Sequence, residues 1–304
     1  MLFKLKSKIL NFPIVRLLII LFKKMVIPGF KGLSMYGLCD MYFSGIVKGA
    51  FSTRASAISF SLFMAIFPFL LFLLNLIPFI PVEGFHDEFL AFLQELLPPK
   101  TSSFFDTILN DIVNQQRVGL LSSTFVLSML FMTNGINAVF SGFQNSYHTK
   151  ITRGFIQQYA VALGIAVIVA LFLFLTVYTT LYYAYIINKY NDYLIVGDTL
   201  FWVNCGRITI FILMTFFITA TLFFFGTKEG KSTPFFSAGA VLTTILIIIT
   251  TYLFGFYINN FSKYNELYGS IGALLIMMIY IWINSNLVLL GYELNASLRK
   301  LKSI

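Results

Sequence analysis

Few side chains in this sequence could do chemistry in an apolar environment. The most conspicuous are in the stretch NSNLVLLGYELN, where a long apolar run ends with Glu293 and Asn295. A buried amide or carboxylate without a hydrogen-bond partner costs several kcal/mol, so such residues either bond helices together or line a polar path. The candidate residues for a substrate path are Arg54, Ser56, Asn134, Asn137, Asn145, Arg207, Asn284, Glu293 and Asn295.

The spacing of these residues places several of them on common helical faces. Asn134, Asn137, Ser141 and Asn145 step by three, four and four residues, and Asn284 and Asn295 also share a face. We therefore expect the polar faces to look inward, toward a hydrated cavity open to the cytoplasm. With Arg54 beside it, such a cavity suits the head group of an anionic amphiphile. Helix packing alone is the alternative for each single asparagine.

The residue types give little support for metal or redox chemistry. A metal-dependent nuclease needs clustered His and carboxylate ligands, and the only two histidines, His86 and His148, are predicted on opposite sides of a membrane. Cys39 and Cys205 form no metal or redox spacing. No nucleotide-binding loop or hydrolase motif is visible. We predict no metal, no cofactor and no enzymatic activity.

The elements that must position these residues are membrane helices. The 304 residues are 58% hydrophobic and only 11% charged, whereas soluble domains carry about 25% charged residues. A span needs about 20 mostly apolar residues. Six stretches qualify, so we predict an all-α polytopic membrane protein with spans near 55–80, 119–140, 155–187, 200–226, 234–258 and 269–292.

The distribution of charge predicts the orientation. Most of the 21 Lys and Arg fall in the N-terminal segment 1–54, in the two even-numbered loops and in the tail 299–304. The positive-inside rule then places both termini in the cytoplasm. The net charge of +9 is explained in this way, and we predict no nucleic-acid partner. Arg207, well inside the fourth span, either snorkels to the outer interface or has a functional partner within the bundle.

Two regions outside the spans carry amphipathic patterns. The short run 14–27 has cations at both ends and is predicted to lie on the inner membrane surface. The first outer loop, 81–118, contains two amphipathic repeats separated by Pro98 and Pro99, which cover the bundle or form a lid. The predicted organisation is a basic segment 1–54, a transmembrane domain 55–298 and a basic tail 299–304.

Two motifs resemble those of the YihY/BrkB family of bacterial inner-membrane proteins. Phe67 and Pro68 in the first span match the first motif, and the last span matches the second motif closely. The matching residues of the last span begin with Tyr268, Gly269, Ser270 and Gly272 and end with Leu289, Leu290, Gly291, Glu293, Leu294 and Asn295. The loop after the fourth span, FFFGTKEGKSTPFFSAGA, departs from the family pattern.

The resemblance implies a helical bundle in the bacterial cytoplasmic membrane. Family members are linked to virulence and serum resistance, to export of lipid precursors or to salt tolerance, and an old ribonuclease label also exists. We expect a protein that moves or presents a lipid-like anionic molecule, with membrane lipids as partners. The alternatives are a cation/proton transporter that uses Glu293, and a scaffold that recruits envelope proteins through its outer loop. A homo-oligomer and an envelope protein partner stay open.

Overall fold

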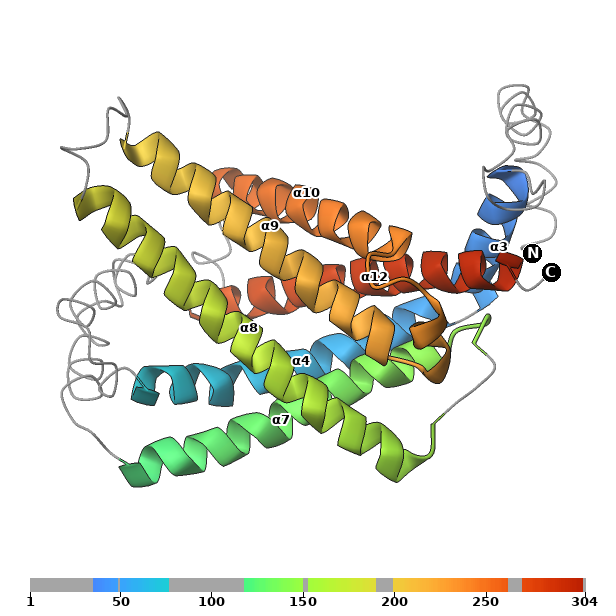
Figure 1. Ribbon diagram of the computed structural model, residues 1–304, viewed down its shortest axis with the longest axis horizontal. Coiled ribbons are helices and arrows are strands. Elements are labelled where there is room, and N and C mark those ends of the chain that lie inside the picture. Colours follow the sequence, from blue (N-terminus) through green and yellow to red (C-terminus); the bar gives the residue numbers. More distant parts are fainter. Residues whose placement is uncertain are drawn as a thin grey trace.

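The computed structural model describes residues 35–48, 50–76, 118–149, 153–189, 199–261 and 270–302, and these contain helices without any strand (Figure 1). The expected all-α fold is therefore confirmed. The helices are α3 (Met35–Lys48), α4 (Phe51–Leu76), α7 (Val118–Gln144), α8 (Phe155–Lys189), α9 (Thr199–Phe225), the short 3-10 helix η2 (Lys228–Ser232), α10 (Ala238–Phe261) and α12 (Ser270–Lys302).

Six of these helices are long and apolar enough to cross a membrane, as predicted. Their candidate spans contain 21 to 28 residues each. Helices dominate because backbone N–H and C=O groups in lipid must be paired within the segment itself. α4, α7, α8, α9, α10 and α12 are thus the six spans.

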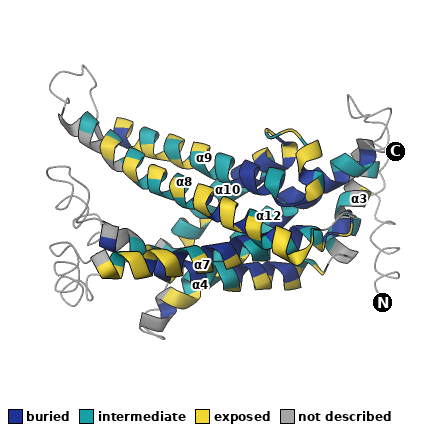
Figure 2. Ribbon diagram, turned by 60° about the horizontal axis from the view of Figure 1, so that its bottom comes forward, coloured by how far each residue is buried: buried dark blue, intermediate teal, exposed yellow. Residues whose placement is uncertain are grey.

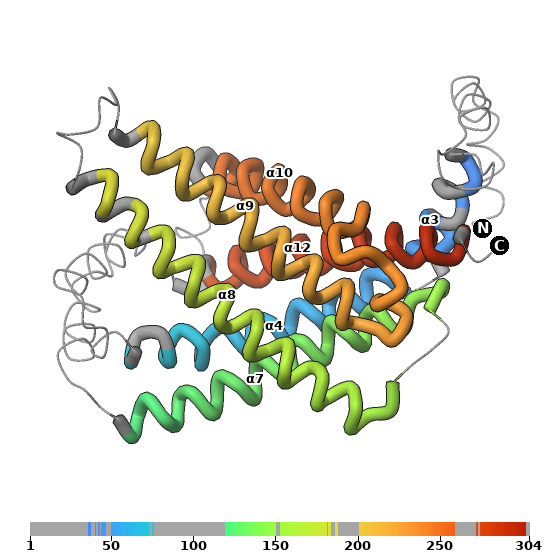
Figure 3. Tube along the Cα trace, in the orientation of Figure 1, coloured from blue at the N-terminus to red at the C-terminus, as the bar shows by residue number. Residues whose placement is uncertain are grey.

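The six long helices form a closed ring in which each helix packs against the next. The order is α4, α7, α8, α9, α10 and α12, and α12 closes the ring by packing on α4. The chain runs up and down, so α4, α8 and α10 begin at the end where α7, α9 and α12 finish (Figure 3). This end carries Arg54, Arg153, Lys228, Lys231, Arg299 and Lys300 and is called the basic end below.

Buried residues gather toward the basic end (Figure 2). In α9, for example, the buried run is 219–223, near the end of the helix, and α10 buries Gly239 and Ala240 near its start. Alanines contribute much of this core: Ala55, Ala162, Ala166, Ala220, Ala240 and Ala296 are all buried. Small residues let helix backbones approach closely, which is how membrane helices gain van der Waals contact.

The helix boundaries differ from expectation at the basic end. α12 continues through Lys302, so Arg299 and Lys300 belong to the helix and not to a separate tail. Its last turns pack against α3, which the sequence did not predict, and Ser297 and Leu301 are buried there. The amphipathic patterns of 14–27 and of the outer loop up to 117 lie outside the described residues, as do Tyr268 and Gly269.

Pro68 lies inside α4 and is buried. A proline within a helix removes one backbone hydrogen bond and crowds the preceding turn. The hydroxyl of Ser128 on α7 lies 2.6 Å from the carbonyl oxygen of Pro68, within donating distance. The proline segment is therefore held against the neighbouring helix.

Candidate functional site

A buried ion pair joins the first span to the last at the basic end. Arg54 Nη2 and Glu293 Oε1 are 2.8 Å apart, and the two side chains are 6% and 0% exposed. Arg54 lies in the first turn of α4, and Glu293 lies on α12. Such a pair offsets the loss of hydration only when its remaining donors and acceptors are also bonded.

α7 and the turn that follows it supply two of those bonds, whereas Arg54 Nε is buried and has no hydrogen-bond partner among the described residues. Arg54 Nη1 donates to the carbonyl oxygen of Gly142 at 2.8 Å, and Ser146 donates to Glu293 Oε2 at 2.8 Å. Both carboxylate oxygens thus accept a hydrogen bond. The arrangement ties α4, α7 and α12 together at one point.

α3 covers this ion pair. A Cβ at Gly45 would lie only 2.8 Å from Glu293 Oε2 and 3.0 Å from His148 Nε2, so glycine permits the close contact. Tyr42, one turn earlier on α3, is close enough to Glu293 for the negative charge of that carboxylate to affect it. Burial, and then the negative charge of Glu293, raise the pKa of Tyr42 to about 12. Its hydroxyl is therefore protonated throughout the physiological pH range.

A cavity of about 550 Å³ opens beside Arg54 between α4 and α7. Its polar lining includes Thr53, Arg54, Ser141 and Asn145. Glu293 and Asn295 are not among its lining residues, because Glu293 lies behind Arg54 and Asn295 faces α10. This space, called the Arg54 cavity, brings together two of the predicted path residues.

Asn295 bonds α12 to the start of α10. Its Oδ1 accepts from the backbone N–H of Gly239 at 2.8 Å, and its Nδ2 donates to Ser237 Oγ at 2.8 Å. Gly239 is in the first turn of α10, where backbone N–H groups have no partner within the helix. Asn295 therefore caps a neighbouring helix, and its geometry is that of helix-to-helix bonding.

We expect Asn295→Ala to lower the free energy of unfolding by about 1–3 kcal/mol, because it leaves the buried N–H of Gly239 unpaired. Equilibrium unfolding of the purified protein in detergent measures this. Asn286→Ala is the matched control, because Asn286 Nδ2 donates to Trp282 O in its own helix and is only half-buried. The prediction is wrong if the two variants lose equal stability.

The asparagines of α7 face α8. Gln158 Nε2 donates to Asn137 Oδ1 at 2.6 Å and to Ser141 Oγ at 2.9 Å, and the Tyr159 hydroxyl lies 3.5 Å from Asn134 Oδ1. The expectation that these polar faces all look inward is wrong for Asn134 and Asn145, which are exposed. A partner on the neighbouring helix satisfies Asn134 at the bundle surface instead.

Two further path candidates lie away from the ion pair. Ser56 is exposed, contrary to the inward face expected for it, and its hydroxyl donates to Ser52 O within α4 at 3.0 Å. Arg207 is exposed on α9 toward the opposite end of the bundle. The exposure of Arg207 favours snorkelling over a partner inside the bundle.

Asn284 borders a second cavity at the centre of the ring, of about 330 Å³. Its Nδ2 donates to Tyr280 O at 2.8 Å within α12. Its Oδ1 is buried and has no hydrogen-bond partner among the described residues. Asn284 thus has an unused acceptor beside a largely apolar space, called the central cavity below.

Several residues of the basic end carry bonds that sequence reasoning did not single out. The Tyr292 ring stacks on Phe143 with centroids 4.2 Å apart, and its hydroxyl lies 2.9 Å from Thr149 Oγ1. Arg299 pairs with Glu229 of η2 at 3.2 Å. Tyr292 adjoins Glu293 in the motif GYELN, but Phe143 and Thr149 lie far from it in the sequence, so the spacing within α12 could not identify them.

The described part of the chain holds no group of three His, Cys, Asp or Glu residues placed to bind a metal ion. His148 is buried, and its Nδ1 lies 3.5 Å from Lys300 Nζ. The site therefore consists of hydrogen bonds, one buried ion pair and two cavities.

These features define a multi-pass membrane protein with a polar cluster at one end of a helical ring. The chain belongs to the family described as Virulence factor BrkB, which matches residues 42–303. No solved structure matches it.

Three curated relatives extend this comparison. The putative ribonuclease-like protein YfkH of Bacillus subtilis is 25% identical over 253 residues, which is 83% of this chain and 91% of the relative. A UPF0761 membrane protein of Aggregatibacter aphrophilus is 22% identical over 87% of this chain and 93% of its own length. One from Acinetobacter baylyi is 23% identical over 81% of this chain, but the match covers only 58% of that longer relative.

Proposed function

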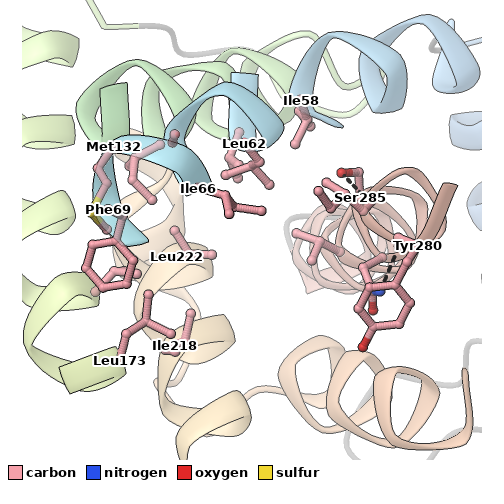
Figure 4. A pocket seen from close by; sticks show the side chains of 17 residues that line it. Ile58, Leu62, Ile66, Phe69, Met132, Leu173, Ile218, Leu222, Tyr280 and Ser285 are labelled. Carbon is pink, nitrogen blue, oxygen red and sulfur yellow. Dashed lines mark hydrogen bonds between the residues drawn. The ribbon is translucent and has the colours of Figure 1, made fainter. Parts of the chain in front are cut away.

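We propose that this protein moves or presents an anionic amphiphile, such as a lipid or a lipid-like molecule, across the cytoplasmic membrane for the upkeep of the cell envelope. The observation that carries this proposal is the apolar central cavity, which is lined by residues of five of the six ring helices (Figure 4). Its lining residues come from α4, α7, α8, α9 and α12.

The lining of the central cavity suits an acyl chain. Fourteen of its seventeen lining residues are apolar, among them Leu62, Phe69 and Leu222, and the polar ones are Tyr280, Asn284 and Ser285. Its volume lies at the lower end of the range of small-molecule pockets. Apolar cavities of this kind exclude water and accept apolar guests. A hydrated ion would find almost no ligands there.

The Arg54 cavity suits the head group of the same molecule. Arg54 borders the polar cavity, and Ile58, one turn further along α4, borders the central one. Ile58 packs against Gly142, which borders the Arg54 cavity: its Cδ1 lies 2.8 Å from the position of a Cβ at Gly142. The two cavities therefore adjoin at Ile58 and Gly142.

The buried ion pair disfavours a cation/proton transporter. Such a transporter needs a carboxylate that alternates between charged and neutral forms. Both carboxylate oxygens of Glu293 are already bonded, to Arg54 and to Ser146, so a transporter that used this carboxylate would have to break the buried pair in each cycle. The scaffold alternative rests on the outer loop, which lies outside the described residues.

A non-enzymatic role is part of the proposal. The name of the Bacillus relative includes the words ribonuclease-like. Metal-dependent nucleases bind their ions through clustered carboxylates and histidines, and the described residues offer no such cluster. The other two relatives are named as membrane proteins only.

Filling the central cavity should slow transport. We expect wild-type protein in vesicles to move labelled anionic phospholipid between leaflets, and Ala65→Leu to slow this movement at least tenfold. Ala65 is buried on α4 and borders the cavity, so the larger side chain occupies the space of the acyl chain. Reduction of the label by a membrane-impermeant reagent measures the rate.

Ala160→Leu is the matched control, because it adds the same atoms at an exposed position of α8. It should move lipid at the wild-type rate. The proposal fails if wild-type vesicles match empty vesicles, or if Ala65→Leu moves lipid as fast as Ala160→Leu does. Proton flux driven by sodium or potassium would favour the ion transporter instead.

A further inference from the structure

A further groove lies on the surface of the ring, between the start of α8 and the end of α9. It is a groove of about 420 Å³, called the α8–α9 groove. One part of its lining is basic and consists of Arg153, Lys228 and Lys231. The other part is mainly apolar and consists of Gln157, Val161, Gly164, Ile165, Ile168 and Phe225.

The basic part is built by the loop that joins α9 to α10 and by the residue that leads into α8. Arg153 Nη1 donates to Phe225 O at 2.6 Å, which fixes its guanidinium against the end of α9. Lys228 and Lys231 are exposed on η2. The acid of the same short helix, Glu229, pairs with Arg299 at 3.2 Å and does not line the groove. The lining is thus positive without a compensating carboxylate.

The fold of the loop holds the two lysines in place. Thr227 is buried and caps η2, because its Oγ1 accepts from the backbone N–H of Gly230 at 3.0 Å. A Cβ at Gly230 would lie 2.5 Å from Phe223 O, so only glycine lets the loop pack this tightly on α9. The charged end is therefore preorganised, which lowers the ordering cost of binding an anion.

Arg153 is partly buried. This partial burial lowers the pKa of the guanidinium from its usual value, because a charged group is less stable away from water. An anion beside it would offset that cost. The apolar part of the groove indicates what kind of molecule would carry such an anion.

The apolar part follows one stripe of α8. The lining positions 157, 161, 164, 165 and 168 are spaced by four, three, one and three residues, so they share one helical face. At 1.5 Å per residue the stripe is ~16 Å long. A Cβ at Gly164 meets nothing within 4 Å, so the groove is open there. This shape fits an extended chain and is longer than a free phosphate needs.

We propose that the α8–α9 groove binds an anionic phospholipid of the adjoining leaflet, with its phosphate between Arg153, Lys228 and Lys231 and one acyl chain along Val161, Gly164 and Ile168. The central cavity is lined by other residues of α8, Val169 and Leu173. The groove is therefore a separate site. It does not depend on the proposed function, because a lipid bound here need not cross the membrane.

Two independent changes test the two halves of the site. Native mass spectrometry of the full chain, titrated with phosphatidylglycerol and separately with phosphatidylcholine, measures the affinities. Lys228→Gln with Lys231→Gln should weaken phosphatidylglycerol binding about thirtyfold, since each cation near anionic lipid contributes about 1 kcal/mol. The double Arg variant at the same positions keeps the charge and should bind as the wild type does.

Gly164→Leu should fill the groove and weaken binding of phosphatidylglycerol at least tenfold. Gly255→Leu is the matched control, since a Cβ at Gly255 on α10 also meets nothing within 4 Å. Neither change is expected to disturb folding, and equal melting temperatures verify this. Glycerol phosphate, which has the head group without chains, should bind at least a hundredfold more weakly.

Three results would overturn the proposal. The first is unchanged phosphatidylglycerol affinity in the double Gln variant. The second is an equal loss of affinity in Gly164→Leu and Gly255→Leu, which would mean general contact with the bundle surface. The third is binding of glycerol phosphate as tight as that of the lipid, which would indicate a site for a soluble phosphate. Because these readouts require no lipid movement, they are distinct from the transport assay.

Discussion

Glu293→Gln and Arg54→Met should each lower the free energy of unfolding by about 3–5 kcal/mol. Each change leaves the other member of the buried pair without its counter-charge, and removal of one partner is much costlier than removal of both. The pair also holds Gly142 O and Ser146, so the loss extends to α7. Equilibrium unfolding in detergent measures these free energies.

The double variant Arg54→Met with Glu293→Leu distinguishes a buried charge from a general packing defect. It should be more stable than either single variant, because apolar side chains replace both charges. Glu229→Gln is the matched control: its pair with Arg299 is longer, at 3.2 Å, and is 14–17% exposed, so the expected loss is smaller than for the Arg54–Glu293 pair. Additive losses in the double variant would contradict the prediction.

Gly291→Ala should destabilise the packing of α12 on α10 by about 1–3 kcal/mol or more. A Cβ at Gly291 would collide with Thr243 Oγ1 and lie 2.7 Å from Gly239 O. Backbone cannot move aside as a flexible side chain can, so the two helices would have to separate. The thermal unfolding midpoint in detergent reports the change.

Gly255→Ala provides the comparison on α10 itself. Its Cβ meets open space, and alanine favours a helix over glycine by about 0.5–1 kcal/mol. This variant should therefore be as stable as the wild type or more stable. If Gly291→Ala unfolded at the same temperature as Gly255→Ala, the close approach of α10 and α12 would be in error.

The six spans could be predicted from the sequence because each has a window of mean hydropathy of at least 1.4, which is a local property. The C-terminal end of α12 could not be predicted in this way. Arg299 and Lys300 resemble a solvated tail, yet they extend the helix because α3 and η2 supply partners for its last turns. Hydropathy indicates how well a segment suits the bilayer, but not which other segments will pack against it.

The candidate site could also be predicted only in part from the sequence. The composition of the spans singled out Arg54, Glu293 and Asn295, because charged and amide groups are rare in an apolar helix. It did not show that Glu293 bonds Arg54 and Ser146 while Asn295 bonds Gly239. Those pairings depend on which helix neighbours which in the ring, and the helical period of one span carries no information about that order. Ser146 and Tyr42 were missed for this reason.

The closure of the ring by α12 also bears on how the chain matures. Arg54 enters the membrane with the first span, and its counter-ion follows 239 residues later on the last one. Until α12 has been inserted, every partly synthesised form carries an uncompensated positive charge at the mouth of its first helix. Such intermediates are expected to be short-lived or protected by the insertion machinery, and a chain that stops before Ser270 should be a target for membrane quality control.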